Sequence, residues 1–108
     1  MVLLTGSAVN VRTGTGTTPL HWAADRGHKD VVELLISKGA NVDAVDKRGN
    51  TPLHMTAIKG NKDVAKVLIL KGANVNAVGD RNVTPLSMAG YNNNKDVSEL
   101  LIKHGAHY

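Results

Sequence analysis

The segment Thr18-Pro19-Leu20-His21 decides the fold, because it returns as Thr51-Pro52-Leu53-His54 and again as Thr84-Pro85-Leu86-Ser87. Each copy is displaced from the preceding one by 33 positions. A fixed period of this length is the sequence signature of a solenoid, in which one supersecondary unit recurs along the chain. The sequence therefore predicts a repeat protein.

The self-match extends over nearly the whole chain of 108 residues. Residues 31–36 align with residues 64–69 and 97–102, and residues 39–42 align with residues 72–75. Gly105-Ala106 continues this last series and Gly6-Ser7-Ala8-Val9 precedes it. We expect a single domain of three repeats, preceded by the remnant of another; the predicted divisions are residues 1–11 (remnant), 12–44, 45–77 and 78–108.

The local signals within one period predict two short helices joined by a turn. Thr18 is a favourable N-cap, Pro19 suits a first helical turn, and Gly27 is expected to end the helix in a left-handed conformation. In the third repeat Asn93 takes the place of this glycine, and asparagine also tolerates positive φ. The first helix of each repeat is thus expected to be about two turns long.

The second helix of the period is predicted from its charge and its apolar spacing. Asp30 lies where an acid stabilises a helix N-terminus, and Lys38-Gly39 ends the helix. Val31, Leu34 and Leu35 are expected to form the apolar stripe that faces the core. Because one helix pair cannot cover its own apolar faces, neighbouring repeats must stack on one another.

These motifs together resemble the ankyrin-repeat family, which has a 33-residue period and a Thr-Pro-Leu-His segment at the start of the first helix. The resemblance implies an all-α ankyrin-repeat solenoid of stacked antiparallel helix pairs, with projecting hairpin loops called fingers. It also implies that a protein partner binds the concave face. Residues 13–16 and 79–82 depart from the Asp-x-x-Gly pattern at residues 46–49, and Ser87 interrupts the histidine series.

Composition narrows the classes of function. No cysteine is present, which excludes a disulfide framework, a cysteine-ligated zinc site and a thiol nucleophile. The 13 Lys and Arg exceed the 9 Asp and Glu, a bias that indicates either simple solubility or an acidic partner. The apolar run Met1-Val2-Leu3-Leu4 is too short for a signal peptide or a membrane span. We expect a soluble intracellular protein with no membrane partner, and a monomer unless the repeat ends self-associate.

Candidate catalytic and metal-binding groups have simpler structural interpretations. His21 and His54 share one repeat position, where the resemblance implies hydrogen bonds that fasten a loop rather than a metal site. Ser37, Ser87 and Ser98 lack a nucleophile elbow, and Gly14-Thr15-Gly16 lacks the Lys-Ser or Lys-Thr of a phosphate-binding loop. The chain is expected to be no enzyme, to hold no cofactor or metal, and to bind no nucleic acid, because its cations are interspersed with acids.

The repeat register separates the positions that keep one identity from those that vary, and varied surface positions on a scaffold are where partners are recognised. Trp22, Met55 and Met88 share one position, and for Trp22 a core role and a groove role remain open. The cationic loop residues form either a row that binds a partner or a solvated loop edge; they are Arg12, Lys47, Arg48 and Arg81. The predicted partner-binding residues are Arg12, Thr15, Thr17, Trp22, Asp25, Arg26, Lys47, Arg48, Asn50, Met55, Ile58, Lys59, Arg81, Val83, Tyr91 and Asn92.

Two further hypotheses concern the context of the chain. The short first segment indicates that these repeats belong to a larger protein, as a structural or targeting part whose activity lies elsewhere. Asn76 lies in a loop of the kind that asparaginyl hydroxylases modify in proteins of this family, which makes it a candidate modification site.

Overall fold

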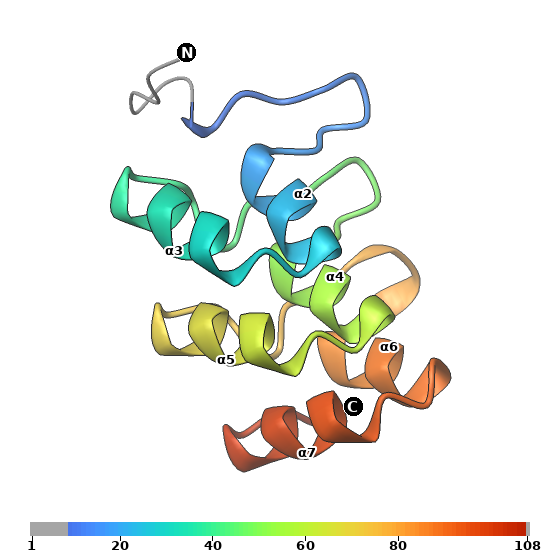
Figure 1. Ribbon diagram of the computed structural model, residues 1–108. Helices are drawn as coiled ribbons and strands as arrows, with labels where there is room; N and C mark the ends of the chain where they lie inside the picture. The colour runs from blue at the N-terminus through green and yellow to red at the C-terminus, as the bar shows by residue number, and fades with distance from the viewer. Residues whose placement is uncertain (1–8, 108) are drawn as a thin grey trace.

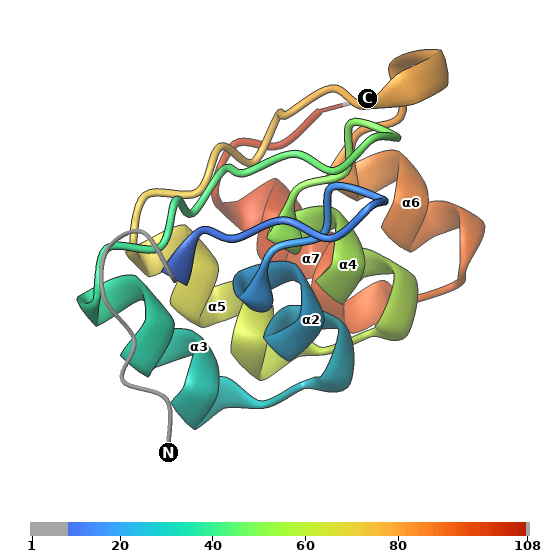
Figure 2. The same cartoon turned by 90° about the horizontal axis from the view of Figure 1, so that it is seen from above.

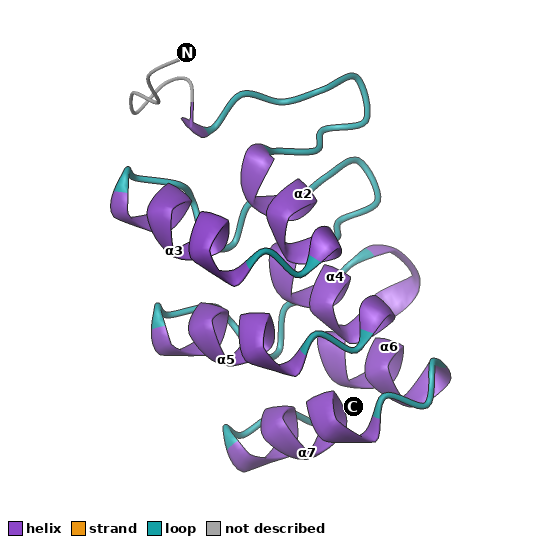
Figure 3. Cartoon of the chain, viewed as in Figure 1, coloured by secondary structure: helices purple, strands orange, loops and turns teal. Residues whose placement is uncertain are grey.

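The computed structural model describes residues 9–107, and these residues form stacked helix pairs with no β-strand among them (Figures 1 and 3). The first helices of the pairs are α2 (Pro19–Arg26), α4 (Pro52–Lys59) and α6 (Pro85–Tyr91). The second helices are α3 (Lys29–Ser37), α5 (Lys62–Leu70) and α7 (Lys95–Lys103). A 3-10 turn, η1 (Asp80–Asn82), lies in the third finger. The molecule is elongated, at 39 × 25 × 20 Å, as expected for a solenoid.

Each first helix begins with a capping box, as the sequence predicts. The hydroxyls of Thr18 and Thr51 accept hydrogen bonds from the backbone N–H three residues later, and a proline occupies the first turn of the helix. Gly27 and Gly60 follow the last turn with φ of 71° and 80°, and Asn93 has a φ of 58°. The left-handed helix ends are therefore confirmed, including the one at asparagine.

The second helices α5 and α7 begin differently, because their N-cap side chains bind the preceding repeat instead of their own helix. The Asn61 side-chain amide donates to the Ala24 carbonyl at 3.0 Å, and that of Asn94 donates to the Ala57 carbonyl at 2.6 Å. A Cβ added to Gly60 would lie 2.9 Å from the Asn94 side chain. Glycine at the first-helix end therefore leaves room for the asparagine that joins one repeat to the next.

A second set of side chains joins the loops that follow the second helices. The Asn10 side-chain oxygen accepts from the Asn41 N–H, that of Asp43 from the Asn74 N–H, and that of Asn76 from the His107 N–H. Asn76 also donates to the Gly105 carbonyl at 3.3 Å. The Asn76 amide is thus engaged through both its oxygen and its nitrogen, and the modification of Asn76 stays a prediction.

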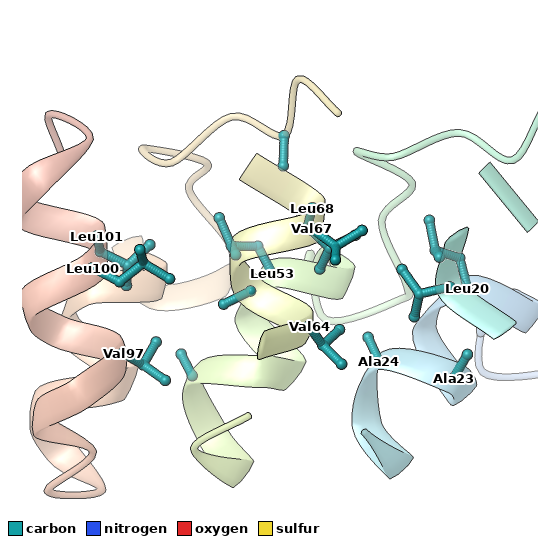
Figure 4. Packing of buried hydrophobic residues seen from close by; sticks show 14 of the residues in the cluster. Leu20, Ala23, Ala24, Leu53, Val64, Val67, Leu68, Val97, Leu100 and Leu101 are labelled. Atoms are coloured by element: carbon teal, nitrogen blue, oxygen red, sulfur yellow. The ribbon is translucent and has the colours of Figure 1, made fainter. Parts of the chain in front are cut away.

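The core runs along the stack as one layer of leucine, valine and alanine between the two rows of helices (Figure 4). Leu20, Leu53 and Leu86 come from the first helices at one repeat position. Leu35, Leu68 and Leu101 supply the corresponding layer from the second helices. Because each layer is shared between neighbours, a single repeat would leave apolar surface in water.

The predicted apolar stripe of α3 is wrong at two of its three members. Leu35 is buried, but Val31 is 38% exposed and Leu34 is 50% exposed. The same repeat positions are covered further along the stack, since Val64 is 2% exposed and Val67 is 8% exposed. Val31 and Leu34 therefore lie on the face that a preceding helix pair covers in the later repeats. The predicted remnant at residues 1–11 lies mostly outside the described residues.

Candidate partner-binding groove

The first two fingers, residues 13–17 and 46–50, are tight hairpin turns of the same geometry. In finger 2 the Asp46 carboxylate accepts from the backbone N–H groups of Arg48 and Asn50, at 2.8 and 2.9 Å, and Gly49 takes a φ of 75°. In finger 1 the Thr13 hydroxyl accepts the equivalent pair at 3.3 Å each, and Gly16 takes a φ of 79°. The departure from Asp-x-x-Gly at residues 13–16 thus replaces a carboxylate with a hydroxyl and keeps the turn.

Finger 3, residues 79–83, departs further from this pattern. Gly79 replaces the turn aspartate and Asn82 replaces the turn glycine, so Arg81 and Asn82 take left-handed conformations with φ of 58° and 60°. The Val83 N–H closes the turn on the Asp80 carbonyl at 3.2 Å. Side chains other than glycine are disfavoured in this conformation, so finger 3 is the strained member of the series.

Neighbouring fingers are joined by backbone hydrogen bonds. The Lys47 N–H donates to the Thr15 carbonyl at 3.0 Å, and the Asp80 N–H donates to the Arg48 carbonyl at 3.0 Å. A Cβ added to Gly49 would lie 2.9 Å from the Gly79 Cα. The fingers therefore form a closely packed row, which Figure 2 shows along one side of the helices.

The two histidines fasten this row to the helices. The Nδ1 atom of His54 accepts from the Thr51 N–H at 3.0 Å, and its Nε2 atom lies 2.9 Å from the Val83 carbonyl oxygen. His21 makes the same contacts with the Thr18 N–H and with the Asn50 carbonyl. Because Nδ1 is an acceptor, Nε2 carries the proton in the neutral ring and donates it to the finger.

Burial lowers the pKa of both histidines below the usual value of 6.5, and the hydrogen bonds to the Asn50 and Val83 carbonyls oppose that shift. A neutral imidazole at each position agrees with the acceptor role of Nδ1. The structure thus supports loop fastening for His21 and His54. Among the described residues, no three His, Cys, Asp or Glu side chains are grouped so as to hold a metal ion.

A concave groove lies between the fingers and the first helices, and it consists of three adjoining hollows. The largest, of about 520 Å³, lies between fingers 2 and 3 and is lined by Arg48, Asn50, Ile58, Asp80, Arg81, Val83 and Met88. The hollow between fingers 1 and 2, of about 360 Å³, shares Arg48, Asn50 and Ile58 with it. A third, of about 380 Å³, shares Arg81, Val83 and Met88 and extends to Tyr91.

Most of the predicted partner-binding residues lie along this groove. Thr15, Thr17, Lys47 and Met55 line the hollow between fingers 1 and 2, and Tyr91 is 89% exposed at the far end. Lys59 and Asp25, at the ends of α4 and α2, line none of the three hollows and form an ion pair at 4.0 Å. Asn92 bonds back to the Met88 carbonyl. Arg12 donates to the Val45 carbonyl across one repeat and also borders the hollow beside Trp22.

Trp22 lies at the finger 1 end of the groove. It is 48% exposed, so it is not a core residue, and with Val11 and Pro19 it lines a further apolar hollow of about 260 Å³, which shares Thr17 with the hollow between fingers 1 and 2. The Arg26 guanidinium lies 5.5 Å from its ring centroid, and the His28 ring centroid is also at 5.5 Å. Ile58 and Tyr91 line other hollows of the groove than Trp22 does.

Two acidic residues of the groove are absent from the predicted set. Asp46 lines the hollow between fingers 1 and 2, and Asp80 lines the largest hollow. Asp80 occupies the repeat position of Lys47, so the register alone marks it as a variable finger residue.

The fold and the groove together define a class, namely a helix-pair solenoid that offers an open recognition surface instead of an enclosed active site. A family model described as ankyrin repeats (3 copies) matches residues 1–79 and 38–108. The chain belongs to the ankyrin-repeat family. Ankyrin repeats are generally protein-interaction modules.

Curated relatives match single stretches of the chain. Acyl-CoA-binding domain-containing protein 1 of Arabidopsis thaliana is 57% identical over 35 residues, which are 32% of this chain and 10% of the relative. Myotrophin of Xenopus tropicalis is 49% identical over 39 residues, covering 36% of this chain and 33% of the relative. Protein fem-1 homolog C of Homo sapiens is 46% identical over 41 residues, covering 38% and 7%. The matched stretches are thus small parts of the relatives.

Within residues 9–107 no helix is both long and apolar enough to span a membrane.

Proposed function

We propose that this chain binds a protein partner in the concave groove formed by the fingers and the first helices. The observation that carries the proposal is the continuity of the three hollows, which share Arg48, Asn50, Ile58, Arg81, Val83 and Met88. These residues stand where the three repeats differ or where their side chains reach the surface. A rigid scaffold that presents such positions side by side is a typical recognition surface.

The chemistry of the groove favours a partner that offers both apolar and acidic groups. Ile58, Met55 and Met88 are half-buried and give an apolar floor, while Lys47, Arg48 and Arg81 are exposed on the fingers. Apolar contact supplies affinity at the centre of an interface, and complementary charge at its rim raises the rate of association. The acidic partner expected from the net charge of +4 fits this arrangement.

The same proposal includes the absence of catalysis and of nucleic-acid binding. The groove is open, and its titratable groups are cations and carboxylates on finger tips rather than a buried acid–base pair. A nucleic-acid surface needs a run of cations with stacking aromatic rings, whereas Asp46 and Asp80 interrupt the cations of the fingers. We further propose an intracellular, soluble monomer that acts through binding alone.

The test uses a photo-crosslinking amino acid at Tyr91, which is in the groove, or at Leu70, which lines a hollow between α3 and α5. A partner that crosslinks from position 91 is purified, and its affinity is measured for the chain with Arg48, Ile58, Lys59 and Tyr91 replaced by alanine. We expect that affinity to fall by about a hundredfold or more, since several interface residues are lost together. An unchanged affinity in a variant with native circular dichroism would contradict the groove assignment.

A second function has its own supporting observation, which is the exposed apolar face of α3 at the start of the stack. Val31 and Leu34 are exposed there, while Val64, Val67, Val97 and Leu100 at equivalent positions are buried by the preceding repeat. We propose that these repeats are one segment of a longer ankyrin array in which a further helix pair covers this face. The full reading frame tests this directly, because a preceding repeat in register supports it and an unrelated sequence opposes it.

A further inference from the structure

We propose that the hollow between fingers 2 and 3 is a carboxylate-binding site, in which Arg48 and Arg81 together hold one acidic side chain of the partner. This inference rests on the proposed function of the groove and names the chemistry that its largest hollow recognises. The occupant is an acidic residue within an extended, partly apolar segment of a protein.

The first argument is the fixed placement of the two arginines. They occupy one repeat position on successive fingers and line the same hollow of about 520 Å³. The hydrogen bond from the Asp80 N–H to the Arg48 carbonyl, at 3.0 Å, joins the two finger tips. Gly79 and Gly49 approach so closely that an added Cβ on either would meet the other's backbone at 2.9 to 3.0 Å. The backbones that carry both guanidinium groups are therefore held together before any ligand binds.

The second argument is that both guanidinium groups lack a carboxylate partner. In the part of the chain that the structure describes, the ion pair within 4.0 Å is that of Lys59 with Asp25, and neither Arg48 nor Arg81 takes part in one. Asp46, the nearest turn acid in finger 2, accepts hydrogen bonds from the backbone of Arg48 and Asn50. Guanidinium groups have a planar fork geometry that matches a carboxylate, so two exposed ones beside a hollow suit such a ligand.

The third argument is the strained backbone of Arg81. Its φ of 58° and ψ of 27° lie in the left-handed region, where glycine is favoured and a long side chain is not. At the same repeat position in finger 2, Arg48 is outside the positive-φ set, and Gly49 takes the left-handed conformation instead. Finger 3 thus has an arginine in a backbone conformation that glycine would adopt without strain. Strained residues of this kind are common at ligand-binding sites.

The fourth argument is the charge and polarity of the lining. Two arginines and Asp80 give the hollow a net charge of about +1, which one carboxylate neutralises and a phosphate of charge near −2 exceeds. Ile58, Val83 and Met88 supply apolar surface beside the charged groups. This lining favours an acidic residue next to an aliphatic residue over a phosphorylated segment or a nucleic-acid strand.

The test measures the binding of a short fluorescein-labelled peptide of alternating aspartate and leucine by fluorescence anisotropy at low salt. Peptides with asparagine or phosphoserine in place of aspartate, and a single-stranded DNA, are measured in parallel. The variant replaces Arg48 and Arg81 with glutamine. A control variant replaces Lys66 and Lys71, which line the hollow between α3 and α5, with glutamine and removes the same charge elsewhere.

We expect the aspartate peptide to bind more tightly than the asparagine peptide. The ratio of these two affinities should fall by about tenfold in the arginine variant and should be unchanged in the lysine variant. Three results would overturn the inference. They are an equal loss in both variants, tighter binding of the phosphoserine peptide or of the DNA, and no binding of the aspartate peptide up to its solubility limit.

Amide chemical shifts of the isotopically labelled chain separate this inference from the groove itself. Shifts at Ile58, Val83 and Met88 that are equal for the aspartate and asparagine peptides would remove the carboxylate site and leave the groove as the binding surface. Chemical-shift changes confined to α3 and α5 would contradict both the carboxylate site and the assignment of the groove as the binding surface. Shifts at the groove that depend on aspartate and on the two arginines support both.

Discussion

His54 contacts Val83 across the boundary between two repeats, with its Nε2 atom 2.9 Å from the carbonyl oxygen of the valine. The Nδ1 atom of His54 takes part in the capping box of α4, and the Nε2 atom contacts the backbone of finger 3. His21 joins α2 to finger 2 in the same way, through the Asn50 carbonyl at 2.7 Å. Ser87, at the equivalent position of α6, bonds only within its own turn, to the backbone and hydroxyl of Thr84.

Replacement of His54 by alanine is expected to destabilise the chain by ~2–4 kcal/mol. The change leaves the buried Thr51 N–H without its acceptor, removes one of the two donors to the Val83 carbonyl, which keeps the Gly79 N–H, and opens space in the cap. Urea denaturation followed by circular dichroism measures the effect. The control is His104→Ala, at an exposed position, for which we expect a change within ~0.5 kcal/mol. Equal effects of the two substitutions would show that the contact between repeats contributes little.

The buried histidines also predict how stability depends on pH. Burial lowers the pKa of His21 and His54 in the folded chain, whereas the unfolded chain titrates near 6.5. Below pH 6.5 the unfolded state therefore binds more protons, and the free energy of unfolding falls as the pH decreases toward the folded-state pKa values. Thermal unfolding between pH 8 and pH 5 should show this loss, at roughly the values where free histidine titrates.

A variant with glutamine at both His21 and His54 should have a flatter stability profile over that interval, even where its overall stability is lower. An unchanged slope of the free energy of unfolding against pH would show that other groups cause the acid sensitivity.

Three glycine substitutions separate backbone strain from close packing. Gly14→Ala meets nothing within 4 Å and should be neutral or slightly stabilising. Gly72→Ala also meets nothing, but its φ of 96° should cost ~1 kcal/mol. Gly49→Ala combines a φ of 75° with a Cβ only 2.9 Å from the Gly79 Cα, and should cost ~2 kcal/mol or more. The free energies of unfolding of the three variants test this order, which fails if Gly49→Ala costs no more than Gly72→Ala.

Lysine at two equivalent repeat positions, 34 and 67, tests the open face at the start of the stack. Leu34→Lys should change stability by less than ~0.5 kcal/mol, because half of the Leu34 side chain is already in water. Val67→Lys should destabilise by ~3 kcal/mol or more, because that side chain is buried against the preceding repeat. When a further repeat is fused in register ahead of residue 12, Leu34→Lys should become as damaging as Val67→Lys. A persistent neutral effect in the fused chain would oppose the longer array.

The caps and turns of this chain depend on residues close together in sequence, which is why they were predictable. Thr18 and Pro19 start a helix, and Gly27 ends it, through contacts that span a few residues. Asn93 was predicted to take positive φ for the same reason. The family resemblance extended these local signals to the stacked arrangement, and the ankyrin-repeat match agrees with it.

The sequence by itself determined the repeat length and the helix ends, because these depend on local backbone chemistry repeated at a fixed spacing, while the loop-fastening role of His21 and His54 came from the family resemblance. The tertiary structure alone decided which equivalent residues are covered. Val31 and Val64 have the same side chain at the same position, yet only Val64 has a neighbouring repeat against it. It also decided that Trp22 is half exposed instead of part of the core, and that Asp80 lines one hollow with Arg48 and Arg81. Burial and proximity depend on what lies across the stack, and a repeat register does not contain that information.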